Sequence, residues 1–585
     1  MKDLSVKAAA YVAVLIAIIF SLNFRPYPYA DDWAYVSPLG LEWPEAFRWV
    51  FEQHVDHYIP LQKIFHFTLA YLTGYDFRVL LLFNLILAFL TALCMLRVAR
   101  LYRGKVSWGD IIIPLGILNL SLGYTTWAFQ LQFLSSVFFA SLFLYCFVLF
   151  ERGAGQRPGN AGRSNGYLYC AFFSLVALAL CGMNGALSAL VILAGLGGWY
   201  LLSGRKTLPL TRTGLLVLLM PVLTVTTVVL AWQPTGASQT VGSVLNIAEI
   251  HFYLQTASLS SGARNMLGAG GAAGLLLMLI LSGAWLYARY RKNTLDGSDA
   301  ALFSVLLATQ AVLLSVAVGR AVVQGGWTGV VAMHYGPLSV LSPLLLWILL
   351  SRALPGRGVA LLAAGFVAVY VFSYANGLKH RFVHQNQALA HQTTVQLALK
   401  TETDIEQLVD KYTLDLTWKD EDEYKNGVVR GLRALREAGY PIYSLAPPFR
   451  TTRTSLPIGS APDELVSGHQ RVQVDNWREN GDYERTQLDG YTVWGSFVSG
   501  DTDTGSLSLR MRRGQAVFVR TGPVATNQRI VVLANGIQND YPMPLSQAYT
   551  LLVFDSPILP EHFQVIFHDD GDGWGEWAAI ALKRE

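Results

Sequence analysis

The sequence predicts a mainly α-helical, polytopic membrane protein that carries an extramembrane domain after its last span. Hydrophobic residues make up 52% of the 585 residues and charged residues only 14%, whereas a soluble protein has about 25% charged residues. The shortage is uneven, because residues 1–376 hold 23 of the 44 Lys and Arg, whereas 377–585 have the composition of a soluble domain. The net charge of +4 is scattered along the chain, so the sequence indicates a lipid bilayer and no nucleic acid as a partner.

Apolar runs define the membrane part. A span needs about 20 apolar residues, so the shorter runs are expected to have ends misplaced by a few residues. The first run follows a basic N-terminal segment without a small-residue cleavage site, which favours an uncleaved first helix over a signal peptide. The eleven predicted spans are residues 8–22, 77–102, 110–125, 131–150, 167–183, 185–203, 213–231, 268–289, 300–319, 334–353 and 357–376.

The basic residues between the spans predict the orientation. With the N-terminus in the cytoplasm, 17 Lys and Arg fall on the cytoplasmic side and six on the other, as the positive-inside rule requires. Eleven spans then put residues 377–585 outside, together with the loops 23–76, 232–267 and 320–333. The one Asn-x-Ser/Thr sequon lies inside a predicted span, at Asn119. We therefore expect a multi-pass protein of a bacterial inner membrane with a periplasmic C-terminal domain.

The long first outer loop, residues 23–76, is expected to be structured. Segments 43–51 and 60–74 each begin with a Pro near the helix start and place apolar residues on one face, and Gly74 ends the second segment. Both segments are too short or too polar to span a bilayer, so we predict two helices that lie in the membrane interface.

The outer C-terminal part divides into a helical periplasmic connector, residues 377–440, and a periplasmic β-rich domain, residues 441–585. Helical patterns occur at 385–412 and 421–438. The short strand-like runs with Gly, Asp, Asn and Pro between them predict a β-sandwich or jelly roll. All four cysteines lie in or beside membrane segments, so this domain has no disulfide. The predicted strands are 440–445, 490–498, 506–512, 516–520, 529–534, 549–554 and 564–568.

Two adjacent carboxylates, Asp31 and Asp32, follow the first predicted span by a few residues. Charges at the mouth of an apolar helix bundle are costly unless they are solvated, paired or functional. A carboxylate of ordinary pKa, about 3.9, is ionised at neutral pH and can accept a proton from a substrate hydroxyl. The pair is therefore the first candidate for a catalytic site, and a solvated pair that caps the next helix is the structural alternative.

The order of these features resembles the GT-C superfamily, whose members are integral-membrane glycosyltransferases that use polyprenyl-phosphate sugars. The resemblance rests on a first span, the motif Asp31-Asp32-Trp33, two interfacial helices and about ten further spans, and it covers residues 1–376, the expected catalytic module. Segment 52–61 and the motifs Gly319-Arg320 and Met333-His-Tyr335 are similar to a bacterial branch of that superfamily. This chain departs from the branch at two positions where Arg is expected, which are Tyr58 and His334.

The resemblance implies transfer of a hexosyl or pentosyl group from a polyprenyl-phosphate sugar to a periplasmic hydroxyl. The acceptor would belong to a surface glycan, a lipid-linked glycan or a protein. The implied reaction is a direct displacement with inversion, in which Asp31 or Asp32 acts as the base. The resemblance does not choose between the two carboxylates.

Several other outer-face residues are candidates for binding the donor. Arg320 ends an apolar span and can bind a phosphate through two N–H groups, although a snorkelling arginine would also fit this place. His54 and His57 are three residues apart and would share a face on a helix, which leaves substrate contact, a metal site or a structural role open. The remaining donor-site candidates are Tyr58, Lys63, Arg264, His334 and Tyr335, with His66 and His251 as further pocket residues.

Aromatic and amide side chains on the same face are candidates for contacts with a sugar or acceptor, and they are Trp33, Trp127, Gln130 and Gln132. No metal site or cofactor is assigned, and a requirement for a divalent cation stays open. Segments 501–505 and 569–574 look calcium-like but lack the full acidic pattern, so hairpin turns are expected there. Trp574 and Trp577 could stack on a glycan.

Two other function classes remain as alternatives. An O-antigen or polysaccharide polymerase or ligase would be expected to carry a late outer loop rich in Arg and His, whereas the acids here follow the first span. A transporter or flippase of lipid-linked sugars would be expected to show internal repeats or charges at mid-membrane, and the sequence shows neither.

Overall fold

The computed structural model describes most of the chain, and structural statements refer to that part of it. The described residues are 2–55, 57–123, 125–154, 161–202, 212–233, 243–321, 335–401, 404–417, 420–440, 442–443, 447–453, 466–484, 488–524, 527–534, 537–556 and 559–584. They form two compact units. A helical unit contains Met1–Gln396 and Val409–Ile442, and a second unit contains Leu397–Leu408 and Tyr443–Glu585.

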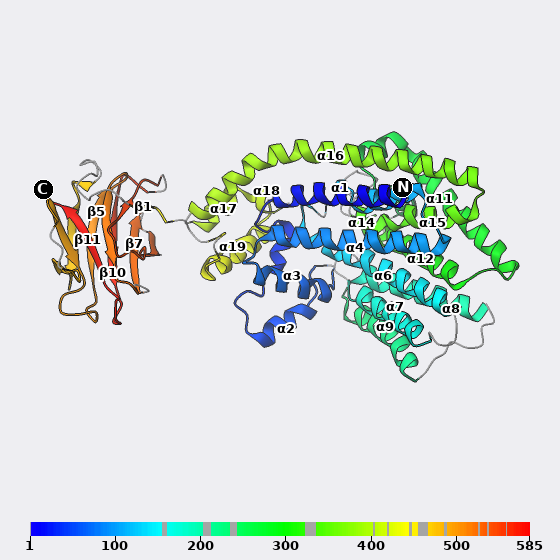
Figure 1. Ribbon diagram of the computed structural model, residues 1–585, viewed down its shortest axis with the longest axis horizontal. Helices are drawn as coiled ribbons and strands as arrows, with labels where there is room; N and C mark the ends of the chain where they lie inside the picture. Colours follow the sequence, from blue (N-terminus) through cyan, green and yellow to red (C-terminus); the bar gives the residue numbers. More distant parts are fainter. Residues whose placement is uncertain are drawn as a thin grey trace. The chain divides into compact units, whose positions relative to one another are not determined.

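The helical unit is built from long apolar helices with short helices between them. In this bundle α1 and α4 pack alongside each other (Figure 1). Its helices up to the predicted connector are α1 (Lys2–Leu22), η1 (Ala30–Tyr35), α2 (Trp43–Phe51), α3 (Pro60–Leu72), α4 (Phe77–Arg103), η2 (Trp108–Ile111), α5 (Ile112–Ile117), η3 (Leu120–Leu122), η4 (Ala128–Gln130), α6 (Leu131–Ala154), α7 (Ala161–Ala179), α8 (Met183–Leu202), α9 (Arg212–Ala231), α10 (Val244–Leu254), α11 (Ser261–Arg291), α12 (Gly297–Arg320), α14 (Gly336–Ser339), α15 (Leu341–Ala353) and α16 (Gly356–Thr401).

Seven stretches of helix in the described residues are long and apolar enough to cross a membrane, so the chain is a multi-pass membrane protein. Five further apolar helices are shorter, and the predicted count of eleven spans therefore stays a prediction. The predicted span at 110–125 is not one continuous helix, because it is divided among η2, α5 and η3. The last predicted span does not end at 376, because α16 continues to Thr401.

Local sequence signals explain where the long helices begin and end. Asp76 caps α4 by accepting a hydrogen bond from the backbone N–H of Arg78, and Gly104 ends the same helix with a φ of +75°. Asp296 caps α12 in the same way through the N–H of Asp299. The backbone of α11 is non-helical at Gly268, which is where the predicted span 268–289 begins.

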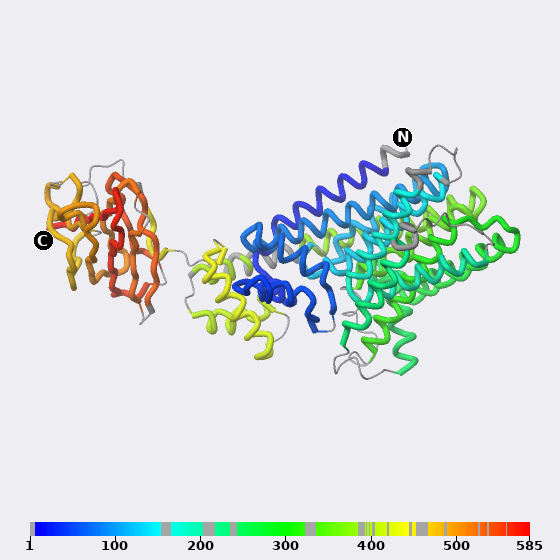
Figure 2. The backbone as a smooth tube through the Cα atoms, turned by 90° about the horizontal axis from the view of Figure 1, so that it is seen from below, coloured from blue at the N-terminus to red at the C-terminus, as the bar shows by residue number. Residues whose placement is uncertain are grey.

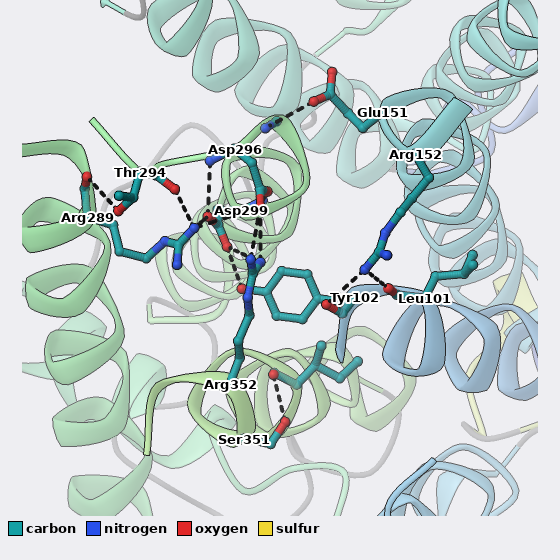
Figure 3. A network of polar contacts seen from close by, with 12 residues as sticks. Leu101, Tyr102, Glu151, Arg152, Arg289, Thr294, Asp296, Asp299, Ser351 and Arg352 are labelled. Carbon is teal, nitrogen blue, oxygen red and sulfur yellow. Dashed lines mark hydrogen bonds and ion pairs between the residues drawn. The ribbon is translucent and has the colours of Figure 1, made fainter. Parts of the chain in front are cut away.

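A charged network joins four helices where α12 begins (Figure 3). The Asp299 carboxylate accepts hydrogen bonds from the Tyr102 hydroxyl at 2.6 Å and from Arg352 at 3.0 Å, and it pairs with Arg289 at 3.0 Å. Asp296 shares Arg352 at 3.1 Å. The side chain of Asp299 is fully buried, so the network ties α4, α11, α12 and α15 together around one buried charge.

The first loop contains η1, α2 and α3. The two amphipathic helices predicted at 43–51 and 60–74 are present as α2 and α3. Figure 2 shows them beside α19 at one end of the helix bundle. The helices that follow α16 are α17 (Ile405–Lys411), α18 (Thr413–Leu416) and α19 (Asp422–Glu437).

The second unit is a sandwich of two antiparallel sheets (Figure 1). One sheet has the order β1-β9-β6-β11-β4-β3 and the other β2-β5-β10-β7-β8. Leu509 and Val565 from one sheet and Val519 and Ile580 from the other belong to one buried core. The strands are β1 (Arg450–Arg453), β2 (Gln470–Asp475), β3 (Arg478–Glu479), β4 (Tyr491–Gly495), β5 (Gly505–Arg512), β6 (Ala516–Thr521), β7 (Gln528–Ala534), β8 (Ile537–Pro542), β9 (Thr550–Val553), β10 (His562–Asp569) and β11 (Ala578–Lys583).

The predicted sandwich is therefore present, and six of the seven predicted strands coincide with β4, β5, β6, β7, β9 and β10. The prediction at 440–445 was wrong for its described residues, since Tyr440, Ile442 and Tyr443 form no strand. Strand β11 was missed because three of its six residues are Ala and Ile580 is its only β-branched residue, whereas strands are rich in β-branched and aromatic residues.

Candidate functional site

The Asp31-Asp32 motif lies on the short 3-10 helix η1. The carboxylate of Asp32 binds back to the start of this helix. Tyr29 is extended and Ala30 has a φ of +54°, a conformation that residues other than glycine rarely adopt. The Asp32 Oδ2 accepts the backbone N–H of Tyr29 at 3.3 Å, and its Oδ1 accepts the backbone N–H of Phe129 at 2.8 Å. Asp32 is only 3% exposed, so its carboxylate fastens η1 to the segment before α6.

Burial raises the pKa of Asp32 to about 7, because the ionised form loses its hydration. The Arg25 charge and the N–H groups of Tyr29 and Phe129 act in the opposite direction. The Arg25 guanidinium lies 3.8 Å from the Tyr29 ring centre and donates to the Asp415 carbonyl at 3.4 Å. Sequence reasoning missed Arg25 as a site residue, although it is the arginine nearest to the acidic pair along the chain.

Asp31 differs from its neighbour in exposure and in partner. Its side chain is 28% exposed, and its Oδ1 lies 3.7 Å from Nε2 of His54. No backbone N–H group is bonded to its carboxylate among the described residues. Asp31 therefore keeps an accessible carboxylate beside an imidazole, on a turn that Asp32 holds in place.

The sequence spacing predicted that His54 and His57 share a helix face. In the structure they do not. They form the bridge of a tight turn, in which each backbone N–H donates to the other's carbonyl at 2.8 and 2.7 Å. Val55 within this turn has a φ of +49°. Both rings lie edge-on to the Phe129 ring, with centroids at 5.6 and 5.8 Å. Within the described residues, which omit Asp56, no cluster of three or more His, Cys, Asp or Glu could hold a metal ion.

The start of α6 links this turn to Arg320. Phe129 binds Asp32, and four residues later the Phe133 ring lies 5.5 Å from the Tyr335 ring. The Tyr335 hydroxyl accepts a hydrogen bond from Nε of Arg320 at 2.6 Å. Phe129 lies in η4 and Phe133 in the first turn of α6, so the two aromatic residues belong to neighbouring helical segments. The structure thus brings Asp31 beside His54, and Arg320 beside Tyr335.

Lys63 is not available to a phosphate. Its ammonium donates to the carbonyls of Trp49 at 2.6 Å and Glu52 at 2.7 Å, and it lies 4.5 Å from the Trp49 ring centre. Lys63 is 2% exposed, and burial lowers its pKa to about 8. The residue therefore satisfies carbonyls at the C-terminal end of α2, a structural role that the helix dipole favours.

Trp33 is buried. The side chain is 7% exposed, and its indole N–H donates to the Leu416 carbonyl at 2.9 Å. Gln130 and Gln132, which were also predicted to contact a sugar, are 1% and 3% exposed. These three side chains pack inside the helical unit, and their contact with a sugar or acceptor stays a prediction. Trp127 is half-buried and stacks on Phe129.

The remaining predicted residues are spread over other parts of the helical unit. Tyr58 packs in an apolar cluster with Ala186 and Val228. His251 neighbours the amide pair of Gln255 and Gln310. The other members of the set are Arg264, which lies in the first turn of α11, His66, which is buried against Tyr35, and His334, which lies outside the described residues.

Several solved structures resemble the chain, among them the following three. An oligosaccharyltransferase AglB from Archaeoglobus fulgidus, in complex with an inhibitory peptide and a dolichol-phosphate, is 15% identical with a TM-score of 0.39, covering 71% of this chain and 60% of its own. The A. fulgidus oligosaccharyltransferase in the apo form is 14% identical with a TM-score of 0.41, covering 70% and 60%. The arabinosyltransferase EmbB from Mycobacterium smegmatis is 14% identical with a TM-score of 0.32, covering 99% and 64%.

The chain spans about three fifths of the length of these proteins. No protein-family profile matches the chain, and no curated protein matches it.

Proposed function

We propose that this protein is a membrane glycosyltransferase that moves a hexosyl or pentosyl group from a polyprenyl-phosphate donor to a periplasmic hydroxyl. The acceptor is a surface glycan, a lipid-linked glycan or a protein. The proposal keeps the predicted eleven spans, a bacterial inner membrane, a cytoplasmic N-terminus and a periplasmic C-terminal domain. One observation supports it most directly. The two adjacent carboxylates on η1 differ in exposure, because Asp32 is buried and Asp31 is accessible.

Asp31 is the base in this proposal, and Asp32 is the residue that positions it. A base must reach the acceptor hydroxyl with a free lone pair. Asp31 meets this condition, because its side chain is 28% exposed and its Oδ1 lies 3.7 Å from Nε2 of His54, which leaves the rest of the carboxylate accessible. Asp32 meets it less well, because it is 3% exposed and each of its oxygens already accepts one backbone N–H group.

The reaction follows as a single displacement. The acceptor hydroxyl gives its proton to the Asp31 carboxylate while its oxygen attacks the anomeric carbon. The bond from that carbon to the phosphate oxygen breaks on the opposite side, its electron pair leaves with the polyprenyl phosphate, and the anomeric configuration inverts. Phosphate is a good leaving group, so the residues that matter most are the base and a cation that holds the phosphate.

Arg320 is the proposed phosphate-binding cation. Its Nε is bonded to the Tyr335 hydroxyl, which fixes the orientation of the guanidinium. A guanidinium binds phosphate oxygens through paired N–H groups. The contact of Phe129 with Asp32 and that of Phe133 with Tyr335 support a donor whose phosphate lies at Arg320 and whose sugar extends toward Asp31.

We also infer that the β-sandwich is a jelly roll. Strands β4 to β11 pair in a nested series, β4 with β11, β5 with β10, β6 with β9 and β7 with β8. A long hairpin rolled over two sheets gives this pairing, and a jelly roll contains eight such strands. A role in glycan binding stays a proposal. Trp574 supports it because it is 77% exposed, whereas Trp577 is 4% exposed and packs in the domain.

The test uses purified full-length protein in lipid nanodiscs with a panel of radiolabelled polyprenyl-phosphate sugars. Asp31→Asn is expected to reduce transfer about 10²–10⁴-fold, the range for loss of a general base, and Asp32→Asn is expected to cause a smaller loss. Asp76→Asn is the matched control, because it removes a carboxylate from the same loop while an amide can still cap α4.

Two results would overturn the proposal in different ways. Transfer by Asp31→Asn at the wild-type rate would exclude Asp31 as the base. Absence of transfer by folded wild-type protein with every donor, together with movement of lipid-linked sugars across the bilayer, would favour the transporter class. A C-terminal alkaline phosphatase fusion tests the topology, since its activity requires a periplasmic C-terminus.

A further inference from the structure

Two short helices far along the chain pack directly against the catalytic turn. Helix α18 ends at Leu416, whose carbonyl accepts the indole N–H of Trp33 at 2.9 Å. The neighbouring carbonyl of Asp415 accepts a hydrogen bond from Arg25, just upstream of η1. Figure 2 shows α19 beside the first-loop helices. Residues almost 400 positions apart in sequence thus meet at the acidic motif.

Gly431 on α19 leaves room for Trp33. A Cβ atom at this glycine would lie 2.7 Å from Cε3 and 3.1 Å from Cζ3 of the Trp33 indole, and 3.6 Å from Val36. The indole is 7% exposed and hydrogen-bonded at its other edge, so it cannot move aside freely. The contact therefore depends on the missing side chain at this position. Gly427, one turn earlier on the same helix, has nothing within 4 Å of such a Cβ.

Trp33 follows the acidic pair directly in η1, so any shift of its ring is passed to the Asp31 backbone. The opposite side of η1 is fastened by Asp32 to Phe129. The turn is therefore held between two supports, the segment before α6 on one side and α18 with α19 on the other. The strained φ of +54° at Ala30 persists only where surrounding contacts over-determine the backbone.

We propose that α18 and α19 set the reactive position of Asp31 through Trp33, which makes Trp33 and Gly431 positioning residues for the transfer reaction. This inference rests on the proposed function and goes beyond it, because it assigns a role in the chemical step to helices that follow the membrane spans. A base displaced by about 1 Å loses up to about 10²-fold in rate. The effect is expected in kcat, because Trp33 is 7% exposed and Gly431 packs against its ring, so both residues act through the position of the turn.

The test compares Gly431→Ala with Gly427→Ala in full-length protein in nanodiscs. Gly431→Ala is expected to lower kcat about tenfold or more, with the KM for the polyprenyl-phosphate sugar within twofold of wild type. Gly427→Ala is expected to leave both constants unchanged. Both variants add the same methyl group to the same helix, so a general effect of alanine on α19 would appear in both.

A double variant gives the second measurement. Trp33→Phe shortens the ring and removes its N–H group, so kcat is expected to fall about threefold to tenfold. If the methyl group acts through the indole, adding Gly431→Ala to Trp33→Phe costs less than adding it to wild type. Additive losses, or an unchanged kcat in Gly431→Ala, would overturn the inference. Failure of the proposed function is recognised separately, because wild type would then show no transfer that depends on Asp31.

Discussion

The charged network at the start of α12 offers a sharp prediction about stability. Asp299 and Asp296 bind the same two arginines, Arg289 and Arg352. Their side chains differ in burial, since Asp299 is 0% and Asp296 39% exposed. Changing either one to Asn removes a single charge with little change of volume. Figure 3 shows that the two carboxylates lie side by side, so the two substitutions compare a buried carboxylate, which also accepts the Tyr102 hydroxyl, with a half-exposed one.

The expected loss follows from what each substitution leaves behind. Removing one partner of a buried pair costs about 3–5 kcal/mol, because an uncompensated charge stays inside. Arg289 and Arg352 are 21% and 30% exposed and can regain some water, which places Asp299→Asn at about 3 kcal/mol, the lower end of that range. For Asp296→Asn we expect about 1 kcal/mol or less, as for exposed pairs, because Asn still caps the helix.

Unfolding in mixed micelles with increasing SDS measures both free energies of unfolding, and thermal unfolding ranks them independently. Turnover per folded molecule is expected to stay at the wild-type value in both variants. Asp299 lies 21 residues before Arg320 on the same helix, which corresponds to about 32 Å. If Asp296→Asn destabilises the protein as much as Asp299→Asn, burial does not determine the strength of this network and the reasoning is wrong.

Two further predictions concern the first loop. Lys63→Met is expected to lower the free energy of unfolding by about 3 kcal/mol, since it removes two hydrogen bonds made by a charged ammonium. The KM for the polyprenyl-phosphate sugar is expected to stay unchanged. A raised KM in a protein of normal stability would show that Lys63 binds phosphate instead. The pKa of Asp32 is raised to about 7. Its contribution to the free energy of unfolding is therefore largest below pH 4, where the carboxyl is protonated in both the folded and the unfolded protein, and it declines as pH rises toward 7. Melting temperatures from pH 5 to 8 should therefore fall more in wild type than in Asp32→Asn, and parallel curves would contradict the shift.

Much of the architecture could be predicted from one-dimensional patterns. Helix α2 begins and ends where its one proline and its apolar spacing place it, and α3 differs by two residues at its end. Apolar runs and the alternating pattern of strands are local properties of the sequence, so they can be recognised without knowledge of the fold. The prediction failed where long-range packing decides the conformation, as in β11, whose neutral sequence is made a strand by its partners β4 and β6.

The candidate site was predictable in its residue type and unpredictable in its roles. The motif Asp31-Asp32 and the late Arg320 stand out in the sequence because charges are rare near the spans. Lys63 stood out for the same reason and Trp33 as part of the acidic motif, yet their polar groups donate to the carbonyls of Trp49 and Leu416. A sequence lists donors and acceptors, but the fold decides which of them are already paired.

The sequence by itself determined that the chain crosses a membrane, that a β-sandwich follows, and that two carboxylates lie just after the first apolar run. Hydrophobicity and strand periodicity are summed over neighbouring residues, which is why one dimension suffices for them. Only the tertiary structure distinguished Asp31 from Asp32. The distinction depends on the N–H of Phe129, 97 residues away, which binds Asp32 and not Asp31, and a contact over such a distance exists only once the chain has folded.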